Sequence, residues 1–245
     1  MLRLGVRKFT ASAAIAFAAA ATMSALADGP AVTLDVVADG NAQNQALVGS
    51  ATNLPHVFNY SGNLLDGGGA WVVSWNFNAS NNSNGGTQAF TAGNYVIQNL
   101  SAQAIEFELT VMLPTALLGS TVYGGSVSGG LTTTGPGGIS NLNGLPAWVG
   151  SSGASTIATL FNFPWGETRP DAGSSSLGFE SFGNPIPSLA GPDLGSDLSI
   201  KLQFVLEANS SASFTSVFVA QIPAPGAMAL LGLAGLTGIS RRRRA

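Results

Sequence analysis

His56 is the single histidine of the chain and the first residue to consider as a catalytic base or metal ligand. A serine hydrolase needs a histidine within hydrogen-bond reach of its nucleophile, and no G-x-S-x-G motif accompanies His56. One histidine in a chain without cysteine is also too few for a typical zinc site. We therefore predict no metal or other cofactor, and we expect His56 to lie at the surface or on an edge strand.

Paired carboxylates are the second source of chemistry, because two of them can hydrolyse a glycosidic bond. Glu106 and Glu108 lie two residues apart in an alternating stretch, which places both on one face of a strand. A solvated strand face is the preferred interpretation. The remaining acids show no catalytic spacing. Several oxygen-bearing side chains suit calcium, but without EF-hand spacing they are interpreted as surface turns: Asp35, Asp39, Asn41, Asp193 and Asp197.

Tryptophan side chains can stack on sugars, so the four tryptophans are candidates for carbohydrate binding. Trp71 and Trp75 share a face with apolar neighbours and are expected in the core. Trp148 in LPAWVG and Trp165 in NFPWGETRP lie in loop-like sequence, which makes them the candidate carbohydrate-binding residues. Packing over the edge of the core is the alternative for both. Arg169 lies near Trp165 in the sequence and is a candidate for the same site, with a structural ion pair to Glu167 or Asp171 as the equal alternative.

The elements that would position these side chains are β-strands. Period-two alternation of apolar and polar residues is clear in five stretches: 32–37, 70–78, 105–111, 198–207 and 213–220. It is weaker at 87–93, 94–100 and 155–163. Asp-Gly and Asn-Gly pairs between the stretches favour tight turns, and residues 119–155 are expected to form a long loop or flexible hairpins. This pattern predicts an all-β body, an antiparallel β-sandwich or jelly roll.

Charge is distributed very unevenly along the chain. Arg169 and Lys201 are the only basic residues between Asp28 and Gln221, and all twelve acidic residues lie in the same segment, so its net charge is −10. Nucleic-acid binding requires lysine and arginine to neutralise phosphates. Nucleic acid is therefore excluded as a partner of this segment.

The N-terminal segment, residues 1–27, has the features of a secretory signal peptide. Three basic residues precede an apolar stretch from Ala11 to Met23, which is too short to span a bilayer comfortably. Ala25-Leu26-Ala27 fits the cleavage pattern, so a mature start at Asp28 is predicted. An uncleaved N-terminal anchor is the alternative.

The C-terminal segment, residues 222–245, combines prolines, an apolar run and four terminal arginines. Gly226 to Ile239 would form a helix about 21 Å long, which is shorter than a bilayer core of about 30 Å. Adding Ile222–Pro225 and Ser240 brings the segment close to spanning length, so a single transmembrane sorting helix is predicted. Arg241, Arg242, Arg243 and Arg244 would stay in the cytoplasm by the positive-inside rule. Pro223 and Pro225 cannot join a helix interior, so they hold Pro223-Ala224-Pro225 extended at the membrane surface.

This order of features resembles the PEP-CTERM sorting domain of bacterial exported proteins, over about the last 24 residues. Ala224 replaces the usual glutamate, as in a Pro-Ala-Pro variant of the motif. The resemblance implies recognition by an exosortase, with cleavage near Pro223–Pro225. It also implies a Gram-negative-type envelope in a species that makes extracellular polysaccharide. A plain tail anchor is the alternative.

The sequence thus predicts three parts: a signal peptide at 1–27, an acidic β-sandwich domain at 28–221 and a sorting segment at 222–245. The leading hypothesis is a non-enzymatic surface or extracellular-matrix protein, cleaved by signal peptidase during export, held transiently in the membrane and then processed by exosortase. A carbohydrate-binding module that uses Trp148 or Trp165 on extracellular polysaccharide is the second hypothesis. A secreted polysaccharide hydrolase is the third.

Overall fold

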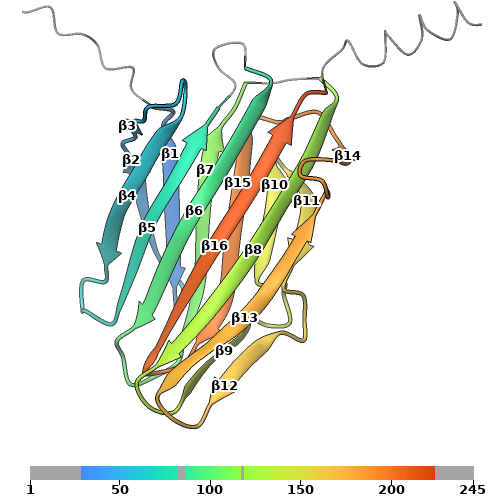
Figure 1. Cartoon of the computed structure of the whole chain (residues 1–245). Helices are drawn as coiled ribbons and strands as arrows, with labels where there is room; N and C mark the ends of the chain where they lie inside the picture. Colours follow the sequence, from blue (N-terminus) through green and yellow to red (C-terminus); the bar gives the residue numbers. More distant parts are fainter. Residues whose placement is uncertain (1–28, 82–85, 117–118, 224–245) are drawn as a thin grey trace, which may run out of the picture.

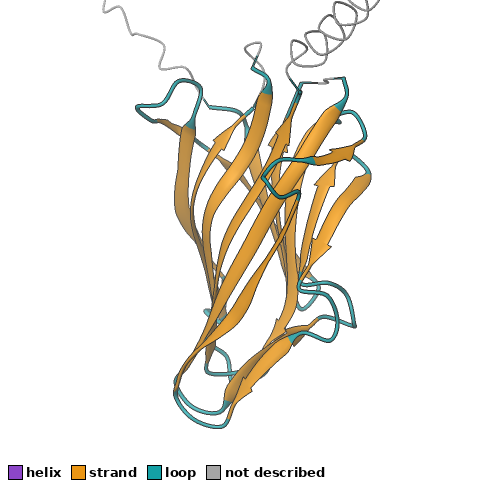
Figure 2. Cartoon of the chain, turned by 45° about the vertical axis from the view of Figure 1, so that its right-hand side comes forward, coloured by secondary structure: helices purple, strands orange, loops and turns teal. Residues whose placement is uncertain are grey.

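The computed structural model describes residues 29–81, 86–116 and 119–223, and every regular element in these ranges is a β-strand (Figures 1 and 2). The prediction of an all-β body is confirmed. The signal segment 1–27, Ala224, Pro225 and Arg241–Arg244 lie outside the described residues. Over the ranges that are described, no helix is long and apolar enough to cross a membrane.

The strands form two antiparallel sheets of eight strands each. Sheet A has the order β11-β10-β15-β7-β1-β2, with β9 also paired to β15 and β12 paired to β9. Its strands are β1 (Val32–Ala38), β2 (Asn41–Leu47), β7 (Ile105–Pro114), β9 (Gly137–Asn141), β10 (Trp148–Ser152), β11 (Ser155–Leu160), β12 (Gly166–Arg169) and β15 (Asp197–Leu206).

Sheet B has the order β13-β8-β16-β6-β5-β4-β3, with β14 also paired to β8. Its strands are β3 (Ser50–Ala51), β4 (Phe58–Leu65), β5 (Trp71–Ser80), β6 (Gln88–Asn99), β8 (Thr121–Thr133), β13 (Gly173–Phe182), β14 (Leu189–Gly191) and β16 (Ser210–Gln221). In Figure 1 the long strands of sheet B lie in front of those of sheet A. The arrangement fits the predicted β-sandwich.

One apolar core fills the space between the sheets, because alternate residues of each long strand face inward. Aromatic rings from opposite sheets meet there. The ring centroids of Phe204 on β15 and Phe214 on β16 are 5.3 Å apart. The ring of Trp71 on β5 meets that of Phe107 on β7 edge-on, with centroids 6.1 Å apart. Trp71 and Trp75 are 4 % and 5 % exposed, so their predicted core positions are confirmed.

Of the two alternatives predicted for residues 119–155, the long loop is wrong, since the segment is mostly strand and β10 and β11 form an antiparallel hairpin. The segment forms β8, β9, β10 and the start of β11. The glycines of β8 are typical of loops and were the reason for predicting one. A Cβ added at Gly125 would lie 2.7 Å from the ring of Phe182, and one at Gly129 would lie 3.0 Å from Leu177. Glycine is therefore used within this strand to make room for large side chains of the core.

Two of the predicted tight turns are confirmed by their backbone angles. Asp39-Gly40 joins β1 to β2 with positive φ at both residues, and Asn143-Gly144 has the same form. The Asp66 carboxylate accepts hydrogen bonds from the backbone N–H groups of Gly68 and Ala70. Asn84-Gly85 lies outside the described residues.

The described chain begins and ends at the same end of the sandwich (Figure 1). β1 runs away from this end and β16 runs back toward it. β9 and β12 lie at the opposite end, together with the turn between β15 and β16.

Candidate functional site

His56 is exposed in the connection between β3 and β4, as predicted for a surface histidine. Its backbone has a φ of 59°, a turn conformation that is uncommon outside glycine. The residue lines a shallow depression of about 300 Å³ together with residues of the β5 and β6 ends, Ser80 and Gln88 among them.

The acidic side chains are used in structure and on the solvated face of sheet A. Glu108 on β7 forms an ion pair with Lys201 on β15 at 2.8 Å, and both side chains are partly exposed. Oδ1 of Asp39 accepts a hydrogen bond from the backbone N–H of Glu106 at 2.9 Å. Among residues 29–81, 86–116 and 119–223, no three His, Asp or Glu side chains gather as a metal site would require.

Trp148 is not a surface residue, and this corrects the prediction that it binds carbohydrate. It lies on β10 between β11 and β15 and is completely buried. Its ring packs against Phe182 and Phe218, and its Nε1 donates a hydrogen bond to Oγ of Ser216 at 2.8 Å. A ring enclosed in this way has no face left for a sugar, so Trp148 belongs to the core.

Trp165 lies at the surface edge of the core, in the connection between β11 and β12. Its ring stacks on Phe161 with centroids 4.8 Å apart and planes inclined by 11°. Nε1 of Trp165 donates to the carbonyl of Leu177 on β13 at 3.2 Å. The partly exposed ring is thus fixed in one orientation by contacts on two sides.

Asn141, at the end of β9, positions the loop that carries Trp165. Its Nδ2 donates to the carbonyl oxygens of Leu145 and Phe161 at 2.7 and 3.1 Å, and its Oδ1 accepts from the backbone N–H of Trp165 at 2.6 Å. The amide is only 9 % exposed. All of its main hydrogen-bonding directions are therefore used within the protein, which makes it a positioning residue.

Asn141 and Trp165 both line a shallow depression of about 520 Å³. Its lining consists of Ser140, Asn141, Phe163, Pro164, Trp165 and Gly166. Phe163 is 67 % exposed, so this loop presents an apolar ring to solvent beside the hydroxyl of Ser140. An aromatic surface with hydroxyl and backbone polar groups around it can stack on the C–H face of a sugar and hydrogen-bond its hydroxyls.

Phe163 was not among the residues that the sequence singled out. The clustering of three aromatic residues in FNFPW, bounded by a proline, was the available signal. Arg169, on β12, forms neither of the ion pairs proposed for it within the described chain. Its Nη1 instead donates to the carbonyl of Ser174 at 3.4 Å.

Pro223 is the last described residue of the predicted sorting motif. It is exposed, one residue beyond Ile222, whose backbone N–H donates to the carbonyl of Thr87 at 2.8 Å. The sandwich therefore holds the chain up to Ile222, next to the Pro223-Ala224-Pro225 motif.

Comparisons with known proteins give little guidance. No family model and no curated protein sequence matches this chain. Among solved structures, similarity was found to TmCBM61, a carbohydrate-binding module solved in complex with beta-1,4-galactotriose. The identity is 11 %, the TM-score is 0.26, and the match covers 62 % of this chain and 88 % of that one. Similarity at this level indicates neither a shared site nor a shared ligand.

Proposed function

We propose that this protein is a non-enzymatic protein of the cell surface or extracellular matrix, cleaved by signal peptidase during export and sorted by exosortase. The sequences of its two ends support export, since a signal-peptide pattern precedes the body and a PEP-CTERM-like segment follows it. The acidic, disulfide-free body between them would be displayed after both ends are removed.

The position of the termini is the observation that best supports display. Both ends of the described chain leave the sandwich on one side, and β9 and β12 lie on the other (Figure 1). While the C-terminal segment is in the membrane, the end of the sandwich from which both termini leave would face the membrane. The end of the body that carries β9 and β12 would then lie away from the membrane, where an extracellular polymer is accessible.

Mass spectrometry of the protein purified from its own cells tests this proposal. We expect the mature chain to begin at Asp28 and to end near Pro223–Pro225. A mature protein that retains Arg241–Arg244 would overturn the sorting proposal and identify a tail anchor. Inactivating the predicted exosortase should lengthen the mature protein by the C-terminal segment, which controls for cleavage by unrelated proteases.

Carbohydrate binding at the Trp165 depression is the second candidate function. The exposure of Phe163 supports it, because a 67 % exposed aromatic ring beside a partly buried tryptophan offers a flat apolar surface on which a sugar can stack. Trp165, with Phe163, is the candidate that remains for this role. Trp148 is excluded by its burial.

Affinity electrophoresis through gels containing soluble polysaccharides tests carbohydrate binding. We expect the detergent-solubilised full chain to be retarded, and Phe163→Ala to abolish most of the retardation. Leu54→Ala is the matched control, because it also truncates an exposed apolar side chain. Leu54 is 59 % exposed and lies in the β3–β4 connection, outside the lining of the Trp165 depression. Equal retardation of the wild type and Phe163→Ala would refute a ligand site at this depression.

A further inference from the structure

The two sheets differ sharply in charge. The strands of sheet A carry seven charged residues: Asp35, Glu106, Glu108, Glu167, Arg169, Asp197 and Lys201. The strands of sheet B carry Glu180 alone. Its Oε2 accepts a hydrogen bond from the backbone N–H of Phe161 at 2.7 Å, so this carboxylate is directed toward the β11–β12 connection. The outer face of sheet B is therefore free of charge, although the body is strongly acidic.

Small hydroxyl and amide side chains cover this uncharged face. Alternation of burial along the strands identifies its outward polar residues, which include Asn59, Asn76, Asn94, Gln98, Ser128, Thr132, Ser174, Ser211, Ser213 and Thr215. Apolar side chains also lie on this face: Val72, Phe90, Val96 and Val217 are partly exposed, and Phe179, the register partner of Ser128, is 67 % exposed. The polar residues line up across the strands. Asn76, Asn94, Thr215 and Ser128 are successive register partners on β5, β6, β16 and β8.

Hydrogen bonds between neighbours fix several of these side chains. Nδ2 of Asn59 donates to Oδ1 of Asn76 at 2.9 Å and to Oδ1 of Asn78 at 3.1 Å. Oγ1 of Thr215 donates to Oδ1 of Asn94 at 2.6 Å. A ligand that binds this face therefore meets groups that are already ordered, which lowers the entropic cost of binding.

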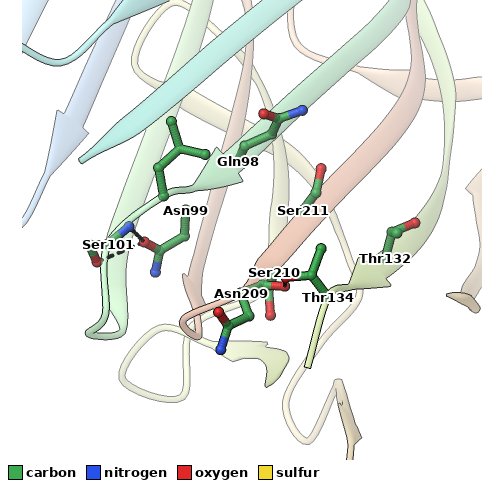
Figure 3. Close-up of a pocket in the computed structure, with 9 residues that line it drawn as sticks. Gln98, Asn99, Ser101, Thr132, Thr134, Asn209, Ser210 and Ser211 are labelled. Atoms are coloured by element: carbon green, nitrogen blue, oxygen red, sulfur yellow. Dashed lines mark hydrogen bonds between the residues drawn. The ribbon is translucent and has the colours of Figure 1, made fainter. Parts of the chain in front are cut away.

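A depression of about 510 Å³ lies on this face at the end far from the termini (Figure 3). Gln98, Ser211 and Thr132 form one row across its floor, because Ser211 is the register partner of both others. The turns between strands add Leu100, Thr134 and Asn209 to its lining. No charged side chain is among the lining residues.

The rim of the depression is held rigidly by Asn99. Its Nδ2 donates to the carbonyls of Gln103 and Leu206 at 2.7 and 2.9 Å, and its Oδ1 accepts from the N–H and the hydroxyl of Ser101. Leu100, next to it, is 59 % exposed. The depression thus combines ordered amides and hydroxyls with one exposed apolar side chain.

The chemistry of this surface favours one kind of occupant. A charged partner would lose hydration on binding and find no counter-charge here. A second copy of the chain would have to bury the rows of hydroxyls and amides around the depression, unlike the mainly apolar core of a stable protein interface. A neutral polysaccharide offers hydroxyls that match the amides and C–H faces that match Leu100, and it carries no ion to desolvate.

We propose that the depression lined by Gln98, Thr132 and Ser211 binds an uncharged polysaccharide chain, which continues along the outer face of sheet B. This site is separate from the Trp165 depression, and it does not depend on the second candidate function. Together with the position of the termini, it places a glycan-binding surface at the end of the body remote from the membrane.

The test is affinity electrophoresis of the detergent-solubilised full chain in gels containing dextran, laminarin, galactan or glucomannan, with alginate as the acidic polysaccharide. We expect retardation by at least one neutral polymer and none by alginate. Ser211→Asp and, separately, Gln98→Ala should each weaken binding about tenfold or more. Ser199→Asp, on the outward side of β15 in sheet A, is the matched control and should bind as the wild type does.

Phe163→Ala distinguishes the two sites, because it removes the ring of the other depression and leaves this face unchanged. Weaker retardation of Ser211→Asp and Gln98→Ala than of the wild type, by a polymer that still retards Phe163→Ala, supports the proposal. Loss in Phe163→Ala alone, or retardation by none of the four neutral polymers, overturns it. A dimer of the wild type that Ser211→Asp dissociates, measured by light scattering, also overturns it, since a second copy would then occupy the face.

Discussion

Nε1 of Trp148 on β10 donates a hydrogen bond to Oγ of Ser216 on β16 across the core, at 2.8 Å. The two residues belong to different sheets and are both completely buried. Most contacts between the sheets are apolar and tolerate small shifts, whereas this hydrogen bond requires one relative position of β10 and β16. It therefore fixes the register in which one sheet lies on the other.

Ser216→Ala should destabilise the protein by about 1–3 kcal/mol, because the indole N–H of Trp148 would remain buried without a partner. The measurement is the free energy of unfolding from urea titration followed by tryptophan fluorescence. Ser213→Ala is the control, since Ser213 is exposed on the other face of the same strand. Equal stability of the two variants would show that the hydrogen bond contributes nothing.

Tyr95→Phe should stabilise the protein or leave it unchanged, by up to about 1 kcal/mol. The hydroxyl of Tyr95 is buried in the core and has no hydrogen-bond partner within the described chain. Removing it removes a desolvated polar group and preserves the ring, which packs against Phe77. Thermal unfolding followed by circular dichroism gives the comparison.

Tyr60→Phe is the matched substitution, because the hydroxyl of Tyr60 donates to the carbonyl of Pro30 at 2.7 Å. We expect this variant to lose about 1 kcal/mol of stability. If Tyr95→Phe instead lost as much as Tyr60→Phe, the Tyr95 hydroxyl would have a partner, such as a buried water, and the prediction would be wrong.

Alkaline pH should unfold the protein through its buried tyrosines. Burial raises the pKa of Tyr60 from 10.0 to about 12, and it raises the pKa of Tyr95 further in the same direction. The native state then holds a proton that the unfolded chain releases. The stability that this proton contributes is complete below pH 10 and decreases as the pH rises toward 12, by about 1.4 kcal/mol per pH unit for each tyrosine.

Urea midpoints measured from pH 8 to pH 11.5 test this dependence, with tyrosinate absorbance to follow ionisation. Tyr60→Phe should reduce the slope above pH 10 because it removes one of the titrating groups. A midpoint that stays constant up to pH 11 in the wild type would mean that the tyrosines ionise in the native state without cost.

Local alternation in the sequence was sufficient to predict the strands that bury one face. β1, β5, β7, β15 and β16 all follow the predicted stretches closely. β6 was predicted as two weaker pieces because Gly93 interrupts the pattern. The structure explains the interruption: Gly93 is the register partner of Phe77, and a Cβ at this position would overlap the backbone of Phe77. The glycine therefore serves packing and does not end the strand.

The error over Trp148 has a similar origin. Proline and glycine on either side of it indicated a loop, yet Gly150 is present because a Cβ there would meet the Trp148 ring at 2.5 Å. Of the residues that line the candidate site, the sequence indicated Trp165 alone. Its partner Asn141 is 24 residues away in the sequence, and no local pattern indicates that their hydrogen bond forms. Contacts of this kind depend on how the sheets pack.

Asn141→Leu should lower the free energy of unfolding by about 3 kcal/mol, because it leaves the carbonyls of Leu145 and Phe161 and the N–H of Trp165 without their partner. The loop with Phe163 and Trp165 would then lose its fixed position. If this loop binds polysaccharide, affinity should fall even under conditions where the variant is fully folded.

Asn162→Leu is the control for Asn141→Leu, since Asn162 is exposed in the same loop and makes one long hydrogen bond, to Thr159 at 3.4 Å. It should change stability by no more than about 0.5 kcal/mol. Urea titration gives the stability of both variants, and acrylamide quenching of tryptophan fluorescence reports the exposure of Trp165. Asn141→Leu should raise quenching and Asn162→Leu should not. Unchanged quenching in a destabilised Asn141→Leu would limit the role of Asn141 to holding β9 in place, because the Trp165 ring would then keep its position through Phe161 and Leu177 alone.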